Sequence, residues 1–143
     1  MPVGTVVLTP GAAYAVDPHA VLDLSAEDPP MEEWAARTAL GIHQANPPGP
    51  VLLVLSGPAC AQAPHLGFAQ RAARRAVAGY VLIDPALPRP GAVPDWPDAP
   101  VVVIVTAYAD ADTRTAALGA RLRGWEVREG DAESAIREIA QEP

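Results

Sequence analysis

The sequence predicts an α/β domain in which a mostly parallel sheet of about six strands lies between two layers of helices. Six short apolar runs alternate with four helical segments in near-strict order, which is the pattern of α/β folds with parallel sheets. The runs Val51–Leu55 and Tyr80–Ile83 are apolar without polar alternation, as expected of strands that are covered on both faces. The length of 143 residues corresponds to a single domain, 1–143.

The amino-terminal part predicts two strands and a helix. Residues 4–9 form a short apolar run that Pro10-Gly11 ends, and residues 20–25 form a second, weaker strand. Asp28 is placed to cap a helix whose first turn holds prolines, and Asn46 begins the segment that ends it. Residues that share one apolar helical stripe are Met31, Trp34, Ala35, Thr38 and Ile42.

The stretch from Pro50 to Asp84 predicts a strand, a turn, a helix and a second strand. The first strand, 51–55, stops at Ser56-Gly57-Pro58; a helix is predicted over 66–76 and a strand over 80–83. Two such strands pair in parallel, and ligands of open parallel sheets sit beyond the carboxyl ends of the strands. The side chains that follow these strand ends are Ser56, Cys60 and Asp84.

The last part of the chain predicts two strands and two helices after a proline-rich loop over 87–98. The run 100–106 is the richest in β-branched residues and is expected to be an interior strand. Asp110 and Asp112 offer caps for a helix reaching to about Arg123, with Leu118 and Leu122 facing inward. A short strand over 125–128 follows, and Asp131 caps a final helix that Ile136 and Ile139 dock on the sheet.

Composition excludes several function classes. The net charge is −7, which argues against a nucleic-acid surface, and no apolar run approaches the ~20 residues of a membrane span. The start, MPVGTVVLTPG, lacks a basic segment, so no signal peptide is expected. The single cysteine, Cys60, fits a cytoplasmic protein. There is no zinc spacing, phosphate loop or dinucleotide fingerprint, so we expect neither a metal nor a cofactor.

The order of elements resembles that of the α/β-hydrolase superfamily, in a shortened form without its leading hairpin or cap domain. Thr9-Pro10-Gly11-Ala12 corresponds to the oxyanion loop, AGYVLIDPALP to the strand after the nucleophile elbow, and PVVVIVT to the strand that delivers the triad acid. WEVREGD corresponds to the segment that delivers the triad histidine. The resemblance implies a thioesterase-like or esterase-like domain, and it rests on element order and a few turns.

The catalytic motifs depart from the family pattern, which leaves two nucleophile candidates. The family elbow is G-x-S-x-G. Placed by the strand end, the nucleophile is Ser56, but Val54 and Pro58 stand at the two glycine positions. Placed by its distance from the next strand's Asp84, the nucleophile is Cys60. A helix amino terminus near Cys60 would lower its pKa, whereas most free cysteines are buried and inert.

No histidine stands where the family places its base. That position reads Gly130-Asp131-Ala132, and without a base a serine hydroxyl stays protonated. His65, five residues after Cys60, and His19, after the first turn, are the candidate replacements. Asp110 and Asp112 are expected to be helix caps, and the resemblance makes one of them a candidate for the position of the triad acid.

Further residues are predicted to bind the ligand. The resemblance implies that the amides of Gly11 and Ala12 form the oxyanion site beside Gly57. Asp84 lies at the same sheet edge, although Asp-Pro is also ordinary turn chemistry. Trp96 lies in the proline-rich loop and is a candidate wall of the pocket, whereas Trp34 and Trp125 are expected in the core.

Two classes of function follow. The first is binding of a small apolar or acyl-type molecule, alone or with non-triad chemistry of the cyclase or isomerase type, in bacterial biosynthetic metabolism. The alternative is an esterase or thioesterase that uses Ser56 or Cys60. An acyl-carrier protein is a candidate partner for a basic helix face formed by Arg71, Arg74 and Arg75. A homodimer that covers a sheet edge is a further expectation.

Overall fold

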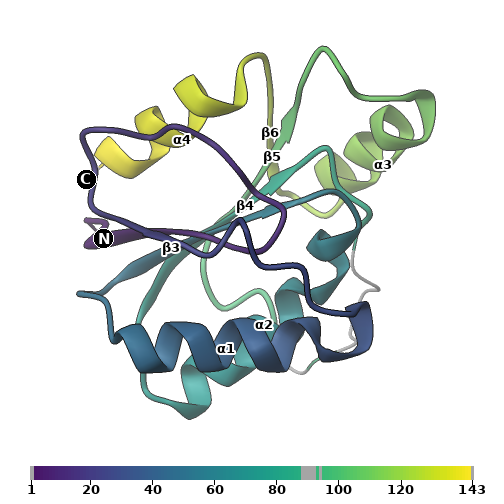
Figure 1. The fold of residues 1–143 in the computed structure, drawn as a ribbon. Coiled ribbons are helices and arrows are strands. Elements are labelled where there is room, and N and C mark those ends of the chain that lie inside the picture. The colour runs from purple at the N-terminus through teal and green to yellow at the C-terminus, as the bar shows by residue number, and fades with distance from the viewer. Residues whose placement is uncertain (1, 88–92, 94, 143) are drawn as a thin grey trace.

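The computed structural model describes residues 2–87, 93 and 95–142. Its strands form one six-stranded sheet in the order β2-β1-β3-β4-β5-β6 (Figure 1). All five pairs of neighbouring strands are parallel. The α/β prediction is therefore confirmed. The strands are β1 (Thr5–Leu8), β2 (Val21–Asp23), β3 (Val51–Ser56), β4 (Val77–Ile83), β5 (Val101–Val105) and β6 (Glu126–Glu129).

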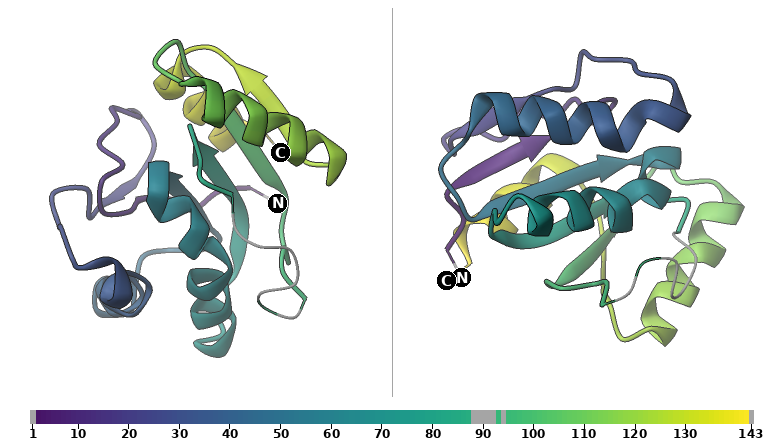
Figure 2. Two further views of the ribbon diagram at one scale, coloured as in Figure 1. Left: turned by 90° about the vertical axis from the view of Figure 1, so that its right-hand side faces the viewer. Right: turned by 90° about the horizontal axis from the view of Figure 1, so that it is seen from below.

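Helices cover both faces of this sheet in a three-layer arrangement. In Figures 1 and 2, α1 and α2 lie side by side on one face and α4 lies on the other. The α-helices are α1 (Trp34–Ala45), α2 (Ala63–Ala72), α3 (Ala111–Leu122) and α4 (Ala132–Gln141). Two 3-10 turns, η1 (Met31–Glu33) and η2 (Gly57–Gln62), lead into α1 and α2. Among the described residues, no helix has both the length and the apolar character that a membrane crossing requires.

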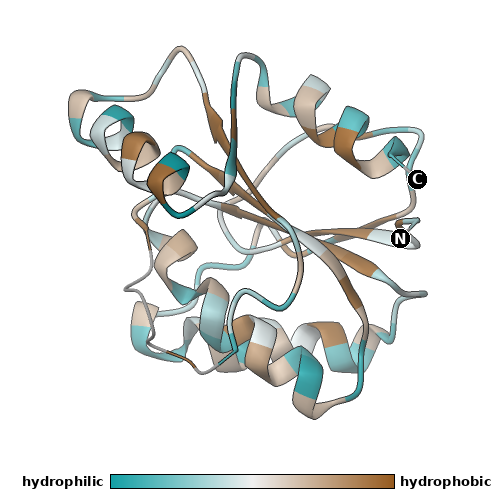
Figure 3. Cartoon of the chain, turned by 180° about the vertical axis from the view of Figure 1, so that it is seen from behind, coloured by the Kyte–Doolittle hydropathy of each residue, from teal (hydrophilic) through white to brown (hydrophobic). Residues whose placement is uncertain are grey.

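The apolar strands separate two cores, one on each face of the sheet. Figure 3 shows the apolar strands passing between helices of mixed polarity. The first core, which we call the three-helix side, joins α1, α2 and α3 to side chains of the central strands, among them Trp34, Ile42, Leu53, Leu66 and Ala117. The second core, the α4 side, joins α4 and the loop after β1 to the opposite side chains, among them Val16, Leu52, Val54 and Ile136.

The first helix begins later than the sequence predicts. Asp28 lies outside the helix, the 3-10 turn η1 starts after Pro30, and the α-helix starts at Trp34. Met31, predicted to be in the buried stripe, is therefore 44% exposed, while Trp34, Thr38 and Ile42 are buried. The predicted end is confirmed, because Asn46 takes a left-handed conformation (φ 46°) and its N–H bonds the Ile42 carbonyl.

The helix predicted over 66–76 is shifted towards the amino end. Prolines are favoured in the first turn of a helix, and Pro58 and Pro64 lie in the first turns of η2 and α2. The helix ends at Ala72, and β4 begins at Val77 rather than at 80. In the proline-rich loop predicted over 87–98, residues 88–92 and 94 lie outside the described part of the chain.

The orientation predicted for the third helix is wrong. Leu118 and Leu122 are 63% and 91% exposed, whereas Ala117 and Ala120 are buried against the sheet. The segment AALGARL offers apolar residues on two sides of a helix, and the small alanines face the strands. The caps are as predicted for Asp110 and Asp131, whose side chains accept the N–H of Thr113 and Ser134.

Candidate functional site at the carboxyl edge of the sheet

The loops that leave β1 and β3 depart to opposite faces of the sheet. The loop after β1 buries Ala12 and Val16 in the α4 side, while η2 and α2, which follow β3, bury Ala59 and Ala63 in the three-helix side. Since β1 and β3 are neighbours, the strand order reverses between them. Open α/β sheets bind ligands at such a point, beyond the carboxyl ends of the strands.

Gly57 forms the corner of the turn between β3 and η2. Its φ is +61°, a region that favours glycine because it has no Cβ. Ser56, one residue earlier, keeps an extended backbone (φ −136°, ψ 139°) as the last residue of β3. A Cβ built on Gly57 meets nothing within 4 Å. The sharp corner, where a nucleophile elbow carries its reactive side chain, is therefore open and holds no side chain here.

Ser56 belongs to the α4 side of the sheet. Successive side chains of a strand alternate between faces, and Leu52 and Val54 pack on that side. The Ser56 Oγ lies 3.3 Å from the Tyr14 Oη, in a hydrogen bond that either hydroxyl can donate. Burial raises the pKa of Tyr14 above its ordinary value of 10, so this phenol is protonated at neutral pH. Ser56 therefore neighbours a proton donor and not a base.

Cys60 lies on the other side of the sheet. Its side chain is fully buried in the three-helix core. Burial raises the pKa of the Cys60 thiol, because a low-dielectric environment disfavours the thiolate. The predicted lowering of this pKa by a helix terminus is therefore wrong: the residue lies inside the 3-10 turn η2. The two nucleophile candidates lie on different faces of the sheet.

The two amides predicted to form the oxyanion site are both bonded within the protein. Gly11 donates its N–H to the Ser25 carbonyl at 3.2 Å, and Ala12 donates its N–H to the Thr9 carbonyl at 2.9 Å. Gly11 has φ +91°, which marks the turn after β1. Neither N–H is left to bind a substrate oxygen in this arrangement, so the geometry argues against the predicted oxyanion role.

The candidate bases and acids have structural positions. His65 is exposed in the first turn of α2. His19 is half-buried, and its Nε2 is buried without a hydrogen-bond partner among the described residues. The Asp110 carboxylate accepts the Thr113 N–H at 2.8 Å, and this bond lowers the pKa of Asp110. Asp112 lies in the first turn of the same helix. The described hydrogen bonds of Ser56 include none of these residues.

Asp84 links two strand ends. It follows β4 in a left-handed conformation (φ 45°), and its carboxylate accepts the Thr106 N–H at 2.9 Å and the Thr106 hydroxyl. Trp96, predicted as a pocket wall, instead packs edge-on between Tyr80 and Trp125, with ring centroids 5.3 and 5.6 Å away. It belongs to the rim of the three-helix core.

A cleft of about 720 Å³ opens at this carboxyl edge, over β4, β5 and β6 on the α4 side. Tyr14 connects it to Ser56. Of the residues singled out as site candidates in the sequence, Asp84 is the one that lines it. The lining residues are Tyr14, Asp84, Thr106, Ala107, Tyr108, Gly130, Asp131, Ala132 and Glu133.

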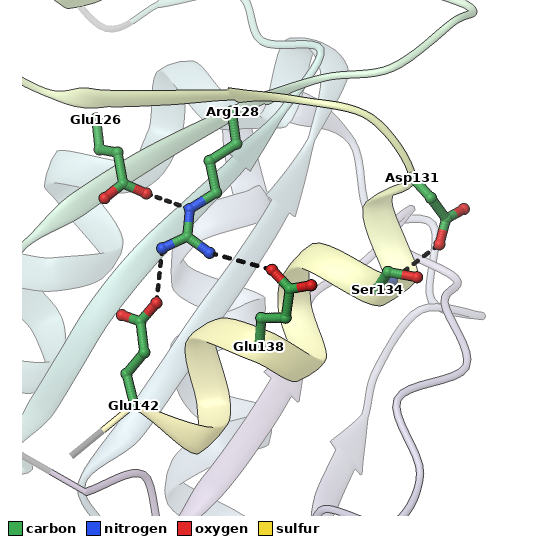
Figure 4. Close-up of polar contacts among 6 residues, drawn as sticks. All are labelled: Glu126, Arg128, Asp131, Ser134, Glu138 and Glu142. Carbon is green, nitrogen blue, oxygen red and sulfur yellow. Dashed lines mark hydrogen bonds and ion pairs between the residues drawn. The ribbon is translucent and has the colours of Figure 1, made fainter.

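Helix α4 holds one wall of the cleft in place. The Glu133 carboxylate accepts the Ala15 N–H, and the Arg137 guanidinium donates to the Ala15 carbonyl at 2.8 Å. These two bonds tie the loop that carries Tyr14 to α4. Behind them, Arg128 of β6 contacts three carboxylates, those of Glu126, Glu138 and Glu142, as Figure 4 shows. Through Glu138 and Glu142 this guanidinium fastens the later part of α4 to the edge strand.

Sequence reasoning missed most of the cleft. Thr106 ends the β-branched run and Tyr14 follows the first turn. The sequence therefore places both near the carboxyl edge of the sheet, but we did not predict either as a site residue. Glu133 is visible in the sequence only as a favourable charge in the first turn of a helix. Among the described residues, no group of three or more His, Cys, Asp or Glu side chains is arranged to hold a metal ion.

The fold is similar to that of a known enzyme domain. A crystal structure of the NocB thioesterase domain, in covalent complex with a fluorophosphonate nocardicin G analog, superposes with a TM-score of 0.50 and 18% identity, over 98% of this chain and 90% of that chain. This likeness shows a thioesterase-like α/β fold. No protein-family model matches the sequence, and no curated protein does.

Proposed function

We propose that this chain, 1–143, is an α/β-hydrolase-like protein with an incomplete triad that binds a small, neutral acyl-type molecule in the cleft at the carboxyl edge. The observation that carries the proposal is the cleft of about 720 Å³ at the carboxyl edge. A volume of this size accommodates a small-molecule ligand.

Covalent catalysis has little support from the two candidate nucleophiles. Ser56 is hydrogen-bonded to a phenol whose pKa is raised, and a protonated phenol cannot accept the serine proton. Cys60 is buried, and its pKa is raised as well, so the thiol form dominates at neutral pH. Nucleophilic catalysis needs a deprotonated group or an adjacent base.

The charges of the lining select the class of ligand. Three carboxylates, those of Asp84, Asp131 and Glu133, line the cleft, and the lining residues that the structure describes include no arginine or histidine. A carboxylate or phosphate ligand would be repelled by these groups. Tyr14 and Tyr108 offer aromatic surface for an acyl chain. The Tyr14 hydroxyl, kept protonated by its raised pKa, is the donor that suits a carbonyl oxygen, in binding or in chemistry of the cyclase or isomerase type.

The wider setting belongs to the same proposal. An acyl group delivered by an acyl-carrier protein, in bacterial biosynthetic metabolism in the cytoplasm, fits a neutral thioester ligand. The two outer strands, β2 and β6, are the edges that a homodimer would cover.

The experiment offers the purified protein the butyryl thioester of N-acetylcysteamine, with butyrate as the charged comparison. We expect ligand-observed NMR to show the thioester bound and butyrate bound at least about tenfold more weakly, with no thiol released in a chromogenic assay. Tyr14→Phe should weaken thioester binding by about fivefold, the loss of one hydrogen bond of ~1 kcal/mol. Thr115→Val, on the exposed face of α3, is the control and should bind as the wild type does.

Two results would contradict the proposal. Equal binding of butyrate and thioester would remove the charge argument. Thiol release that disappears in Ser56→Ala, or in Cys60→Ala, would establish the hydrolase alternative instead.

A further inference from the structure

The outer face of α3 is apolar and basic, although the chain as a whole is acidic. Leu118 and Leu122 are 63% and 91% exposed, and Arg114 and Arg121 are exposed as well. Spacings of four, seven and eight residues from Arg114 place these side chains on one side of the helix. We call these four residues the α3 surface. The net charge of the whole chain is −7.

A groove of about 300 Å³ runs between this helix and β6. Its floor includes Ala117 and Val127, and Leu118 forms part of its wall. Arg114 and Arg121 line the helical side, and Glu129 lines the strand side. The groove therefore joins an apolar floor to a basic rim on α3 and a carboxylate on the strand opposite.

Arg121 has its guanidinium available for a partner. In the described part of the chain it takes no part in any hydrogen bond or ion pair, and Arg114 makes a single long bond of 3.4 Å to the Thr106 carbonyl. Arg75, after α2, is different, because it donates to the Pro47 carbonyl and to Asn46 Oδ1, both at 3.2 Å. Arg75 serves the fold, whereas the two arginines of α3 are available to pair with carboxylates.

We propose that the α3 surface docks an acidic amphipathic helix of a partner protein. Arg114 and Arg121 are seven residues apart, which is about 10.5 Å along a helix axis. A helix lying beside α3 meets both with two carboxylates two turns apart, and an apolar residue between them reaches Leu118 and the groove. A second copy of this chain is disfavoured, because a symmetric contact sets the same arginines against each other. This proposal is independent of the cleft.

The test uses a fluorescent synthetic helical peptide of about 15 residues that carries two glutamates seven residues apart and leucines between them. We expect the full chain to bind it in an anisotropy titration and not to bind a version with lysines in place of the glutamates. Leu118→Ser should weaken binding about tenfold, and Arg121→Gln about threefold. Raising the salt concentration should weaken wild-type binding.

Matched controls change an exposed leucine and an exposed arginine elsewhere. Leu40→Ser on α1, where Leu40 is 54% exposed, and Arg37→Gln should leave binding unchanged. No binding, equal binding of the lysine peptide, or equal losses in the control variants would overturn the proposal. A dimer in sedimentation that Leu118→Ser converts to a monomer would assign the α3 surface to a second copy of the chain. That result would overturn the proposal as well. Circular dichroism verifies that each variant is folded.

Discussion

The two faces of the sheet differ in how they are covered, and the difference places the two candidate nucleophiles in different surroundings. Three helices close the three-helix side, and Cys60 is fully buried there. One helix and the loop after β1 cover the α4 side, and the cleft opens beside them. Ser56, only four residues before Cys60, belongs to this second side. One connection thus delivers a cysteine to a closed core and a serine to the other face, where it bonds Tyr14 of the cleft lining.

The comparison shows why a chemically suitable residue type is not enough for catalysis. A nucleophile needs access, a lowered pKa or a neighbouring base. Cys60 lacks access, and Ser56 has a phenol where a base is needed. The face that is less densely covered is the one on which we propose that the ligand binds.

The largest expected effect is on the three-helix side. Leu66 is fully buried, so Leu66→Ala should lower the free energy of unfolding by about 2–5 kcal/mol. Leu122→Ala removes a side chain that is 91% exposed and should change it by less than about 0.5 kcal/mol. Urea unfolding measures both. Similar losses in the two variants would mean that α3 packs with Leu122 facing inward, as we predicted from the sequence.

The second effect concerns the reactivity of Cys60. Because the thiol is buried and its pKa is raised, iodoacetamide at pH 8 should modify the native protein at least about a hundredfold more slowly than the urea-unfolded chain. Intact mass measures the rate. Rapid labelling of the folded protein would place Cys60 at an accessible site and would restore it as a nucleophile.

A smaller effect is expected where α4 holds the loop of the cleft. Arg137→Ala removes the 2.8 Å bond to the Ala15 carbonyl. We expect a loss of about 1.5 kcal/mol in unfolding free energy, the lower end of the range for a charged hydrogen bond, because Arg137 is half-buried. Thioester binding should weaken too, because Tyr14 lies in the released loop. Arg121→Ala, which removes no described bond, is the control. If Arg137→Ala changed neither the unfolding free energy nor thioester binding, this hydrogen bond would not be needed to hold the loop.

The smallest effect concerns a helix cap at low pH. The Asp131 carboxylate accepts the Ser134 N–H, and this hydrogen bond lowers the pKa of Asp131 below its ordinary value of 3.8. The cap therefore stabilises the fold above that pH, and its contribution is lost as the pH falls through the lowered pKa. An asparagine can cap the helix but does not titrate. The free energy of unfolding of the Asp131→Asn variant should therefore fall less steeply than that of the wild type below about pH 4. Parallel slopes in acid unfolding would exclude this role.

Sequence patterns were sufficient for the sheet but not for every helix face. The apolar runs of β3, β4 and β5 predict buried strands only, because strands that are covered on both faces need no alternation of apolar and polar residues. The third helix has two readings, since AALGARL is apolar on opposite sides. Which side packs depends on how closely the helix approaches β5 and β6, and that is a tertiary property.

The site was predicted less completely than the fold. Strand ends placed Ser56 and Asp84 at the carboxyl edge, because parallel strands end together. The face on which Ser56 lies is set by the register of β3, and a register shift of one residue would reverse it. Likewise, the bonds that occupy the amides of Gly11 and Ala12 come from Ser25 and Thr9, whose carbonyl positions depend on the folded turn.

The most direct test of this account is a titration of the ¹⁵N-labelled protein with the butyryl thioester, in which one NMR sample reports both the binding site and the fate of the ligand. We predict that the amides of Tyr14, Tyr108 and Gly130 shift, that those of Cys60 and Leu66 do not, and that the thioester stays intact. Free thiol appearing in the tube, or shifts centred on the three-helix side, would contradict the claim that this protein binds an acyl-type molecule in its cleft without covalent chemistry.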